Sequence, residues 1–514
     1  MMKIRLLKRK RESAKADGLR HLFIELLDDE GEAPYIENYG LGYFEVLLKR
    51  FNSRNFYVVK CTKKLHELIE KTSQALDKIV ENPNLLEFQE ISFKSIVEHI
   101  SRLFYSSIEE HDLMEDEKEF LSILYTFEFM GIPRLLPLML DAHVQEFYVD
   151  SPDTRIYLDH ERWGRCLTNI VLTGEEVEAI KTHMQTFSGY SIDYSICSLK
   201  TDWYFKKAAY RMSLDTSPLS STGFSLDARR ISSQTYTLSQ LIHSRMLSKE
   251  IALFLLFFLY FGRNVTIIGE TNSGKTTLLN ALDLFLPPEK RRVYVEDVQE
   301  SLDLLRFDYH QAKYRVSPYD VTLRGSKSTE VTKILHRSPN IIILGEIQSE
   351  EHSRALFNSL SSGIRGLQTF HATSPLQAFR RWVFSHKIDP ISLLELDILV
   401  CMGKTHSFPV KRFVSSVYEI LLSDGLKFSL ENFSISLNEI FTRNVSEDFV
   451  NLVPLENTHM FKKLLTSYPE SFLKKFYEKM CKVFEPILEG GSDFENLVKE
   501  IPRAWVTLKD DVEG

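Results

Sequence analysis

A glycine-rich stretch in the middle of the chain carries the clearest chemistry of the sequence. Residues 269–276 read Gly-Glu-Thr-Asn-Ser-Gly-Lys-Thr and match the pattern G-x-x-x-x-G-K-[ST]. Glycines let the backbone turn successive N–H groups inward, toward phosphate oxygens. Lys275 is expected to reach the β- and γ-phosphates of a nucleotide, and the Thr276 hydroxyl to bind Mg²⁺. The expected binding set is Gly269, Glu270, Thr271, Asn272, Ser273, Gly274, Lys275, Thr276 and Thr277.

The context of this stretch favours a phosphate loop over a chance glycine-rich turn. The apolar run 264–268 before it has the character of a strand, and the run 275–286 after it has the character of a helix. The N-terminus of that helix adds a positive dipole end to the site. Strand, loop and helix therefore stand in the order that phosphate binding requires.

Carboxylates follow two further apolar runs. The run 341–344 leads through Gly345 to Glu346, and the strand 292–296 ends in Glu296, followed by Asp297 and, later, Glu300. At the carboxyl edge of a parallel sheet such side chains face the ligand crevice. Glu346 is the expected residue to hold Mg²⁺ or a water. Helix capping is the alternative role for either carboxylate.

His371 follows the short strand 367–370 and precedes Ala-Thr-Ser-Pro. A lone histidine is more often structural than functional. Its place after a strand makes it a catalytic candidate only in combination with the other motifs.

The elements that must position these residues alternate from residue 236 onward. Helical runs at 238–261, 275–286, 328–336 and 350–362 alternate with strand runs at 264–269, 292–296, 340–345 and 367–371. Such alternation predicts an α/β domain with a mostly parallel sheet. Upstream, residues 60–130 show helical periodicity, 144–149 and 155–158 read as strands, and Thr173 caps a helix at 174–187. Downstream, strands are expected at 413–422 and helices at 460–484.

Composition narrows the class of protein. The net charge of −8 over 514 residues gives no basic field for nucleic acid. Five scattered cysteines without a C-x-x-C pair fit a reducing compartment and argue against a zinc site. No run is long enough to span a bilayer, so any membrane association is expected to be peripheral. Residues 1–20 carry eight Lys or Arg, which fits either a solvated terminus or a tether to an anionic surface.

Taken together, the motifs resemble the type II/type IV secretion ATPase superfamily, in particular its archaeal pilus and archaellum assembly members. Its four boxes appear in order as 269–276, 295–300, 341–346 and 363–372. The resemblance extends upstream through 144–152, 156–160 and 163–169 and downstream through 394–400, so it covers about residues 125–405.

The resemblance implies a RecA-like P-loop ATPase domain (α/β), an α+β N-terminal domain and a C-terminal extension. It implies a cytoplasmic homo-hexamer, peripheral to the membrane, that hydrolyses ATP with Mg²⁺. The motor would act through a polytopic membrane platform protein and, indirectly, on pilin-like subunits, without nucleic acid. Assembly of a pilus is preferred over an archaellum. The domains expected are a helical N-terminal segment at 1–125, the N-terminal domain at 126–216, a hinge at 217–235, the ATPase domain at 236–404 and the extension at 405–514.

The resemblance also assigns roles to single residues, and Glu346 is favoured for positioning the attacking water, with Glu296 second. Lys275, Glu346, Glu296 and His371 become the catalytic set, and Arg211 becomes a γ-phosphate ligand, with Arg229 and Arg230 as further candidates. Two departures stand out. Relatives follow the Walker B glutamate with Val-Arg-Gly, where this chain has Ile347-Gln348-Ser349, and their Phe-Thr-Ile-Arg-Lys-Phe segment reads Phe224-Ser-Leu-Asp-Ala-Arg229-Arg230.

Two other functions stay open on the sequence. One is a RecA-like ATPase acting on nucleic acid, which would need a basic groove with stacking aromatic residues. The other is a nucleotide-gated binding module with negligible hydrolysis, against which the intact Lys275, Thr276 and Glu346 argue.

Overall fold

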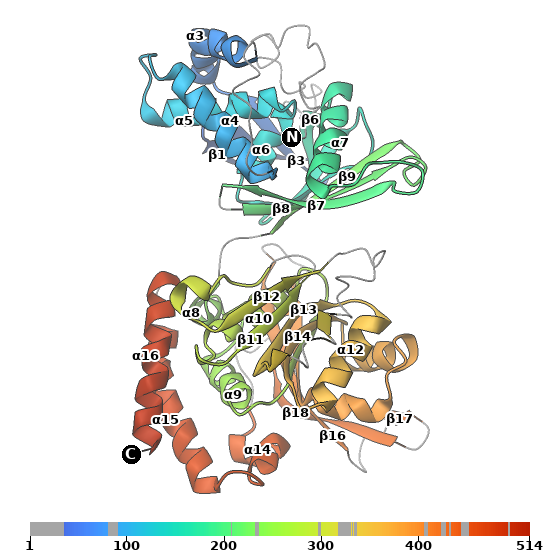
Figure 1. The fold of residues 1–514 in the computed structure, drawn as a ribbon, viewed down its shortest axis with the longest axis vertical. Helices are drawn as coiled ribbons and strands as arrows, with labels where there is room; N and C mark the ends of the chain where they lie inside the picture. Colours follow the sequence, from blue (N-terminus) through green and yellow to red (C-terminus); the bar gives the residue numbers. More distant parts are fainter. Residues whose placement is uncertain are drawn as a thin grey trace. The chain divides into compact units, whose positions relative to one another are not determined.

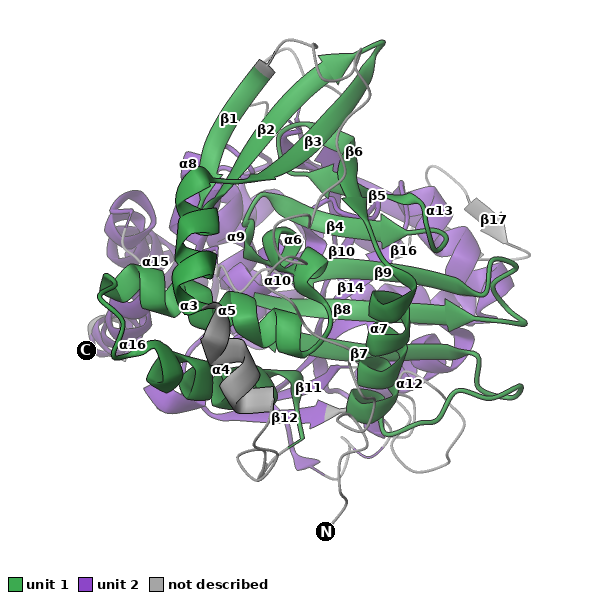
Figure 2. Ribbon diagram, turned by 90° about the horizontal axis from the view of Figure 1, so that it is seen from above, with its two compact units in different colours: residues 1–233 green, residues 234–514 purple. Residues whose placement is uncertain are grey.

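The computed structural model divides the chain into two compact units, residues 1–233 and 234–514 (Figures 1 and 2). It describes residues 35–513 except 81–90, 207, 232–235, 297–299, 317–329, 332, 334–336, 406–409, 423–427, 431–432, 444–451 and 492–493. Each unit has its own sheet and its own core, and each is described by itself.

Unit 1 is built on a 9-stranded sheet of order β1-β2-β3-β6-β5-β4-β9-β8-β7. Neighbouring strands pair antiparallel except β3 and β6, which are parallel. The strands are β1 Tyr35–Leu41, β2 Phe44–Phe51, β3 Arg54–Cys61, β4 Val144–Val149, β5 Arg155–His160, β6 Gly164–Val171, β7 Ser198–Phe205, β8 Ala208–Thr216 and β9 Phe224–Ile231. The predicted strands 144–149 and 155–158 are confirmed.

Helices cover one face of this sheet (Figure 2). They are α3 Lys63–Val80, α4 Phe93–Ile108, α5 Glu115–Phe129, α6 Leu136–Leu140 and α7 Gly174–Ser188. Trp203 of β7 is fully buried and stacks on Phe93 of α4, with ring centroids 4.5 Å apart. The Thr173 side chain accepts a hydrogen bond from the Glu176 N–H, so the predicted cap of α7 is confirmed.

Two expectations for this part of the chain differ from the structure, the second of them only in part. Residues 35–61, placed in a helical segment, form three strands. Residues 217–235 were expected to form a hinge, and the boundary between the two units at 233/234 falls inside this range. Its first part is not a linker, because Ser217–Gly223 closes the turn between β8 and β9, and β9 lies inside the sheet between β4 and β8. Ser, Pro and Gly favour any reversal of the chain, so composition alone does not separate a hairpin turn from a linker.

Unit 2 contains a second 9-stranded sheet, of order β12-β11-β13-β14-β10-β15-β16-β18-β17. The six strands from β12 to β15 run parallel, and β16, β18 and β17 continue the sheet antiparallel. The strands are β10 Val265–Gly269, β11 Arg292–Glu296, β12 Gln311–Arg315, β13 Ile341–Ile347, β14 Arg365–His371, β15 Ile398–Lys404, β16 Arg412–Leu422, β17 Phe428–Leu430 and β18 Phe433–Thr442. This is the expected α/β domain, and its sheet runs on into the C-terminal extension.

Both faces of this parallel sheet are covered, as all-parallel sheets require. Alternate residues of β13 enter different cores: Ile341 and Ile343 join one cluster, and Ile342 and Leu344 the other. The helices of the unit are α8 Leu238–His243, α9 Lys249–Tyr260, α10 Lys275–Leu284, α12 Glu350–Ser361, α13 Pro375–Arg380, α14 His459–Leu464, α15 Glu470–Glu489 and α16 Phe494–Glu513. Figure 1 shows α9, α15 and α16 on one side of the sheet and α12 on the other.

The single helix expected over 238–261 is two helices. Thr237 caps α8, Ser248 caps α9, and Arg245 between them has a φ of 58°. The helix expected at 328–336 falls largely outside the described residues, as do residues 1–20 and Asp297. Among the helices that the structure describes, none combines the length and apolar character needed to cross a bilayer.

Candidate nucleotide-binding site

The predicted loop joins the carboxyl end of β10 to the start of α10. Asn272 and Gly274 both have positive φ, 61° and 90°. A Cβ on Gly274 would lie 2.6 Å from Met246 Cε, and one on Gly269 would lie 2.5 Å from Ser273 Oγ. The close packing at Gly269 and the left-handed backbone at Gly274 explain why glycine is needed at both positions.

The loop has the features of an anion site. Its helix α10 begins at Gly274, and no side chain caps this N-terminus. Ser273 is 1% exposed, and its Oγ has no hydrogen-bond partner. A positive helix end and a buried hydroxyl without a hydrogen-bond partner match the oxygens of a nucleotide phosphate chain. The residues present therefore fit a nucleotide, with Thr276 positioned on α10 to hold Mg²⁺.

Three of the predicted catalytic residues form one polar chain. Lys275 Nζ lies 3.2 Å from His371 Nδ1, and His371 Nε2 lies 2.5 Å from Glu346 Oε1. An ammonium group only donates, so Nδ1 must accept and Nε2 carries the ring proton that is donated to the carboxylate. His371 thereby links the phosphate-binding lysine to the carboxylate. Lys275 Nζ also donates to the carbonyls of Gly269 and Glu270, at 3.1 and 2.8 Å.

The order of the strands explains this juxtaposition. β14, which ends in His371, lies between β10 and β13, and Gly269 pairs in register with His371. The register between β13 and β14 shifts between Leu344 and Ile347. Bulges of this kind re-aim side chains next to functional sites, and this one coincides with Gly345 and Glu346.

Gln348 replaces the arginine that relatives carry two residues after the Walker B glutamate. Its Nε2 donates to Glu346 Oε2 at 2.6 Å, while His371 occupies Oε1. Both oxygens of Glu346 therefore accept hydrogen bonds within this site. The Gln348 side chain thus binds the Glu346 carboxylate of its own chain.

Glu296 lies in a different environment, at the end of β11. It is 6% exposed and accepts hydrogen bonds from the Ser301 N–H at 2.9 Å and the Ser301 hydroxyl at 2.6 Å. Burial raises the pKa of Glu296, although the Ser301 hydrogen bonds and Lys313 oppose the shift. Both carboxylates already accept hydrogen bonds, but the Glu346 side chain is 27% exposed and Glu296 is buried, so water reaches Glu346 more readily.

The structure adds residues that the sequence analysis missed. Lys404 and Arg412, at the facing ends of β15 and β16, contact the loop residues 270–272. Arg381 donates to the His371 carbonyl and lies over the Phe370 ring. Lys404 ends a strand adjacent to the loop strand, and that position was the one available signal.

The candidate arginines all lie in unit 1. Arg211 of β8 and Arg229 of β9 are directly opposite each other, on the face of the sheet away from the buried Tyr210 and Met212. Arg230 points the other way, and its Nη1 donates to the Asp141 carbonyl at 2.6 Å and to Tyr210 Oη at 3.0 Å. Arg230 therefore has a structural role inside unit 1, and Arg211 and Arg229 remain the candidates.

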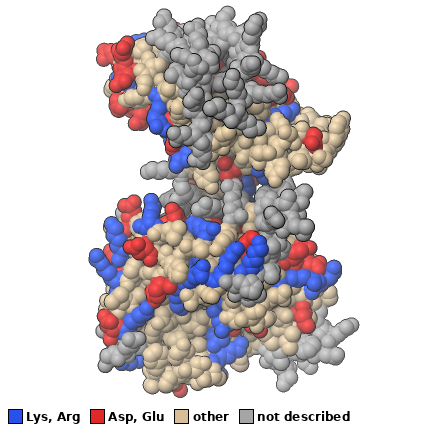
Figure 3. Space-filling model, viewed as in Figure 1, with Lys and Arg blue, Asp and Glu red and all other residues tan. Residues whose placement is uncertain are grey.

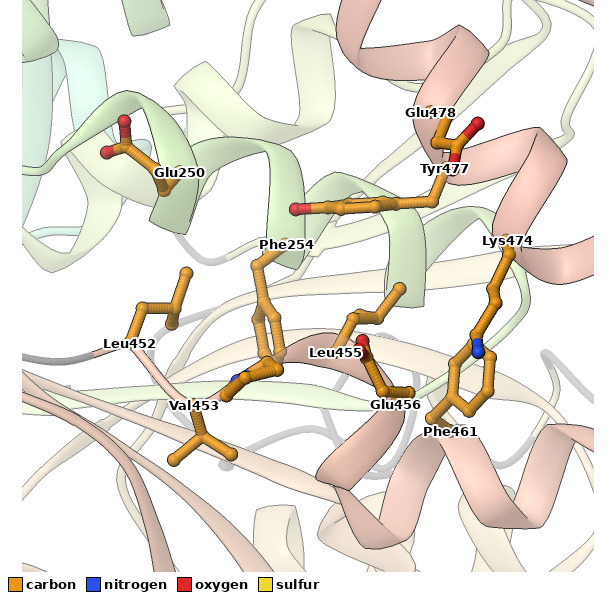
Figure 4. A pocket seen from close by; sticks show the side chains of 11 residues that line it. Glu250, Phe254, Leu452, Val453, Leu455, Glu456, Phe461, Lys474, Tyr477 and Glu478 are labelled. Carbon is orange, nitrogen blue, oxygen red and sulfur yellow. The ribbon is translucent and has the colours of Figure 1, made fainter.

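A cavity of about 420 Å³ lies elsewhere in unit 2 (Figure 4). Its walls come from α9, α14, α15 and the segment 452–456, and it carries apolar side chains with Glu250, Glu456 and Glu478 at its rim. None of the predicted site residues lines it. The loop of residues 269–277, which carries the candidate phosphate-binding groups, lies outside this cavity.

The fold is α/β, and the candidate site is a glycine-rich loop at the end of a parallel strand whose residues fit a nucleotide. Residues 200–384 match the family model described as "Type II/IV secretion system protein". This segment of the chain is therefore similar to the type II/IV secretion ATPases, and the relatives below match it in sequence.

Three relatives illustrate the match. An uncharacterized protein of Methanocaldococcus jannaschii (MJ0781) is 26% identical over 339 residues, 63% of this chain and 44% of its own length. The type IV secretion system protein PtlH of Bordetella pertussis is 34% identical over 124 residues, 23% of this chain and 35% of PtlH. The X-ray structure of the Yersinia pseudotuberculosis ATPase DotB aligns with a TM-score of 0.41 and 14% identity, over 73% of this chain and 93% of DotB. The chain thus spans less than half the length of the first two.

Proposed function

We propose that this protein is an ATP-hydrolysing motor that powers assembly of type IV pilus-like filaments or secretion pseudopili. The observation that carries the proposal is the polar chain from Lys275 through His371 to Glu346, built at the edge of a parallel sheet beside a phosphate loop. The family match supports the same class of activity. In this proposal Thr276 and Glu346 hold Mg²⁺, and Lys275 holds the β- and γ-phosphates.

Each residue of the polar chain has a defined task. Glu346 accepts the proton of the attacking water, or holds that water in line with the γ-phosphate. His371 orients the Glu346 carboxylate through Nε2 and accepts a hydrogen bond from Lys275 through Nδ1, so it couples the positions of these two residues. Arg211 supplies positive charge to the transition state from unit 1.

The proposed working form is a homo-hexamer on the cytoplasmic side of the membrane, engaged with a polytopic platform protein. The sequence relation to PtlH, whose name places it in a type IV secretion system, supports a secretion or pilus setting. On the face shown in Figure 3, Lys and Arg gather over the middle of unit 2 with Asp and Glu interspersed toward its edges. A surface that carries both signs of charge suits docking to a protein. Nucleic acid would instead be attracted by a uniformly basic surface.

The test measures ATPase turnover and molecular mass in parallel, with and without Mg-ATP, for the wild type, Lys275→Ala and Glu346→Gln. We expect Lys275→Ala to lose nucleotide binding, and Glu346→Gln to bind Mg-ATP with turnover reduced by about 100-fold or more. Wild-type turnover should rise with a nucleotide-promoted hexamer. Hydrolysis near the wild-type rate in Glu346→Gln would assign the water-positioning role to Glu296.

A DNA arm in the same assay separates the alternative function. A hydrolysing monomer that DNA stimulates would favour a nucleic-acid motor. Retained filament assembly with Lys275→Ala protein would reject the assembly-motor proposal.

A further inference from the structure

Two cations reach the phosphate loop from the strand pair that follows the parallel sheet. Lys404 is the last residue of β15 and Arg412 the first of β16, and the two pair directly across the antiparallel ladder. β15 in turn pairs with β10, whose last residue, Gly269, opposes Met402. The loop and the two cations are therefore held at the same edge of one sheet.

The contacts cover three successive loop residues. Lys404 Nζ lies 3.1 Å from Glu270 Oε2 and donates to the Thr271 carbonyl at 3.1 Å. Arg412 Nε donates to the Asn272 carbonyl at 2.9 Å, and its Nη2 donates to Asn272 Oδ1 at 3.1 Å. Lys404 and Arg412 are called the loop clasp below.

The loop clasp binds the two energetically unfavourable features of the loop, the left-handed backbone of Asn272 and the negative charge of Glu270. Asn272 has a φ of 61°, a left-handed conformation that non-glycine residues rarely adopt, and Arg412 binds both its carbonyl and its side chain. Alternating right- and left-handed residues turn successive N–H groups into a concave anion site, so this conformation is useful for phosphate. Glu270 adds a negative charge beside that site, and Lys404 pairs with it.

We propose that Lys404 and Arg412 are positioning residues of the nucleotide site, holding residues 270–272 in the phosphate-receiving conformation and neutralising Glu270. This inference rests on the proposed nucleotide-binding function. The two residues act through the loop backbone, and neither is assigned a contact with the nucleotide. The strand pair β15–β16 thereby controls nucleotide affinity.

The experiment measures the affinity of the full chain for Mg-ADP by calorimetry, together with the unfolding temperature without nucleotide. Lys404→Gln and Arg412→Gln should each weaken Mg-ADP binding about tenfold, since hydrogen bonds from charged donors are lost in each. The unfolding temperature without nucleotide should stay close to that of the wild type. Lys411→Gln is the matched control, since its side chain is exposed on the same hairpin, and it should bind Mg-ADP as the wild type does.

Two second-site variants separate positioning from general stability. Glu270→Gln should restore a large part of the affinity lost in Lys404→Gln, because the charge that Lys404 neutralises is gone. In an Asn272→Gly background the effect of Arg412→Gln should shrink, because glycine adopts positive φ without help. Fully additive losses in both pairs would overturn the proposal.

The outcomes also keep the two proposals apart. If the wild type fails to bind Mg-ADP, the nucleotide-binding function itself is rejected. If the wild type binds and both clasp variants bind equally well, only the clasp is rejected. A clasp variant that unfolds at a much lower temperature than the wild type would assign Lys404 or Arg412 a structural role instead.

Discussion

At the residue scale, Glu346 and Glu296 are both candidates for positioning the attacking water, and they differ in burial and in hydrogen-bond partners. Glu346 is half-buried and bonded to His371 and Gln348, whereas Glu296 is buried and bonded to Ser301. Spacing predicted both as strand-end carboxylates. It could not show which would be buried, because burial depends on the segment around Ser301 that folds over β11.

Glu296→Gln tests this distinction through stability. Burial raises the pKa of Glu296 in the folded protein, so folding favours the protonated carboxyl and is opposed by its ionisation. Above the unfolded-state pKa, about 4.3, ionised Glu296 therefore weakens folding, and the cost grows as the pH rises through the folded-state pKa. The variant should unfold at a higher temperature than the wild type at pH 8, with a smaller gain at pH 5.

Asp303→Asn is the control for that measurement, because Asp303 is an exposed carboxylate and its neutralisation should not raise the unfolding temperature as Glu296→Gln does. A stability gain for Glu296→Gln that does not vary with pH would reject burial of an ionised carboxylate as its cause. Turnover in the same variant should remain measurable if Glu346 positions the water.

At the element scale, a buried ion pair joins the helix of the phosphate loop to the strand of Glu296. Asp283 near the end of α10 and Arg292 at the start of β11 are both fully buried, with Nε and Oδ1 3.1 Å apart. Tyr294 Oη donates to Asp283 Oδ2 at 2.5 Å, and Arg292 Nη2 donates to the Leu286 carbonyl at 2.6 Å. The pair fixes the end of α10 to the start of β11.

Asp283→Asn should cost about 3–5 kcal/mol of unfolding free energy, because it leaves the buried Arg292 charge uncompensated. Urea unfolding of the full chain provides the measurement. The apolar pair Asp283→Leu with Arg292→Met should recover much of the loss. Lys509→Gln, which removes an exposed pair with Glu289, should change stability by less than about 1 kcal/mol. An equal loss in Asp283→Asn and Lys509→Gln would contradict the role given to the buried pair.

Some elements of the fold could be predicted from the sequence and others could not, and the difference has physical reasons. The loop and the strands beside it follow from local pattern, since β10, β11, β13 and β14 all appear near their expected places. The strands of 35–61 were missed because Val46–Leu48 and Tyr57–Val59 are buried on successive residues and lack the alternation that marks a half-exposed strand. Lys404 and Arg412 were missed because their partners lie more than 100 residues away.

At the scale of the whole molecule, the two units have separate hydrophobic cores. The core clusters of unit 1 run no further than Phe224–Ala228 of β9, and those of unit 2 begin at Leu238. All the candidate phosphate- and Mg²⁺-binding residues except the arginines lie in unit 2. The expected hinge at 217–235 contains the boundary between the units at 233/234 but begins one strand too early, since β9 belongs to unit 1.

A fragment of residues 234–514 is therefore expected to fold by itself and to bind Mg-ATP with the affinity of the full chain. Its turnover should fall about tenfold or more, because Arg211 and Arg229 are absent and their charge no longer stabilises the transition state. Circular dichroism melting, calorimetric titration and ATPase assays on fragment and full chain check the three parts. A fragment that does not fold would show that the two cores depend on each other. A folded fragment that hydrolyses ATP at the full rate would remove unit 1 from the reaction, and Arg211→Ala in the full chain would then also be without effect.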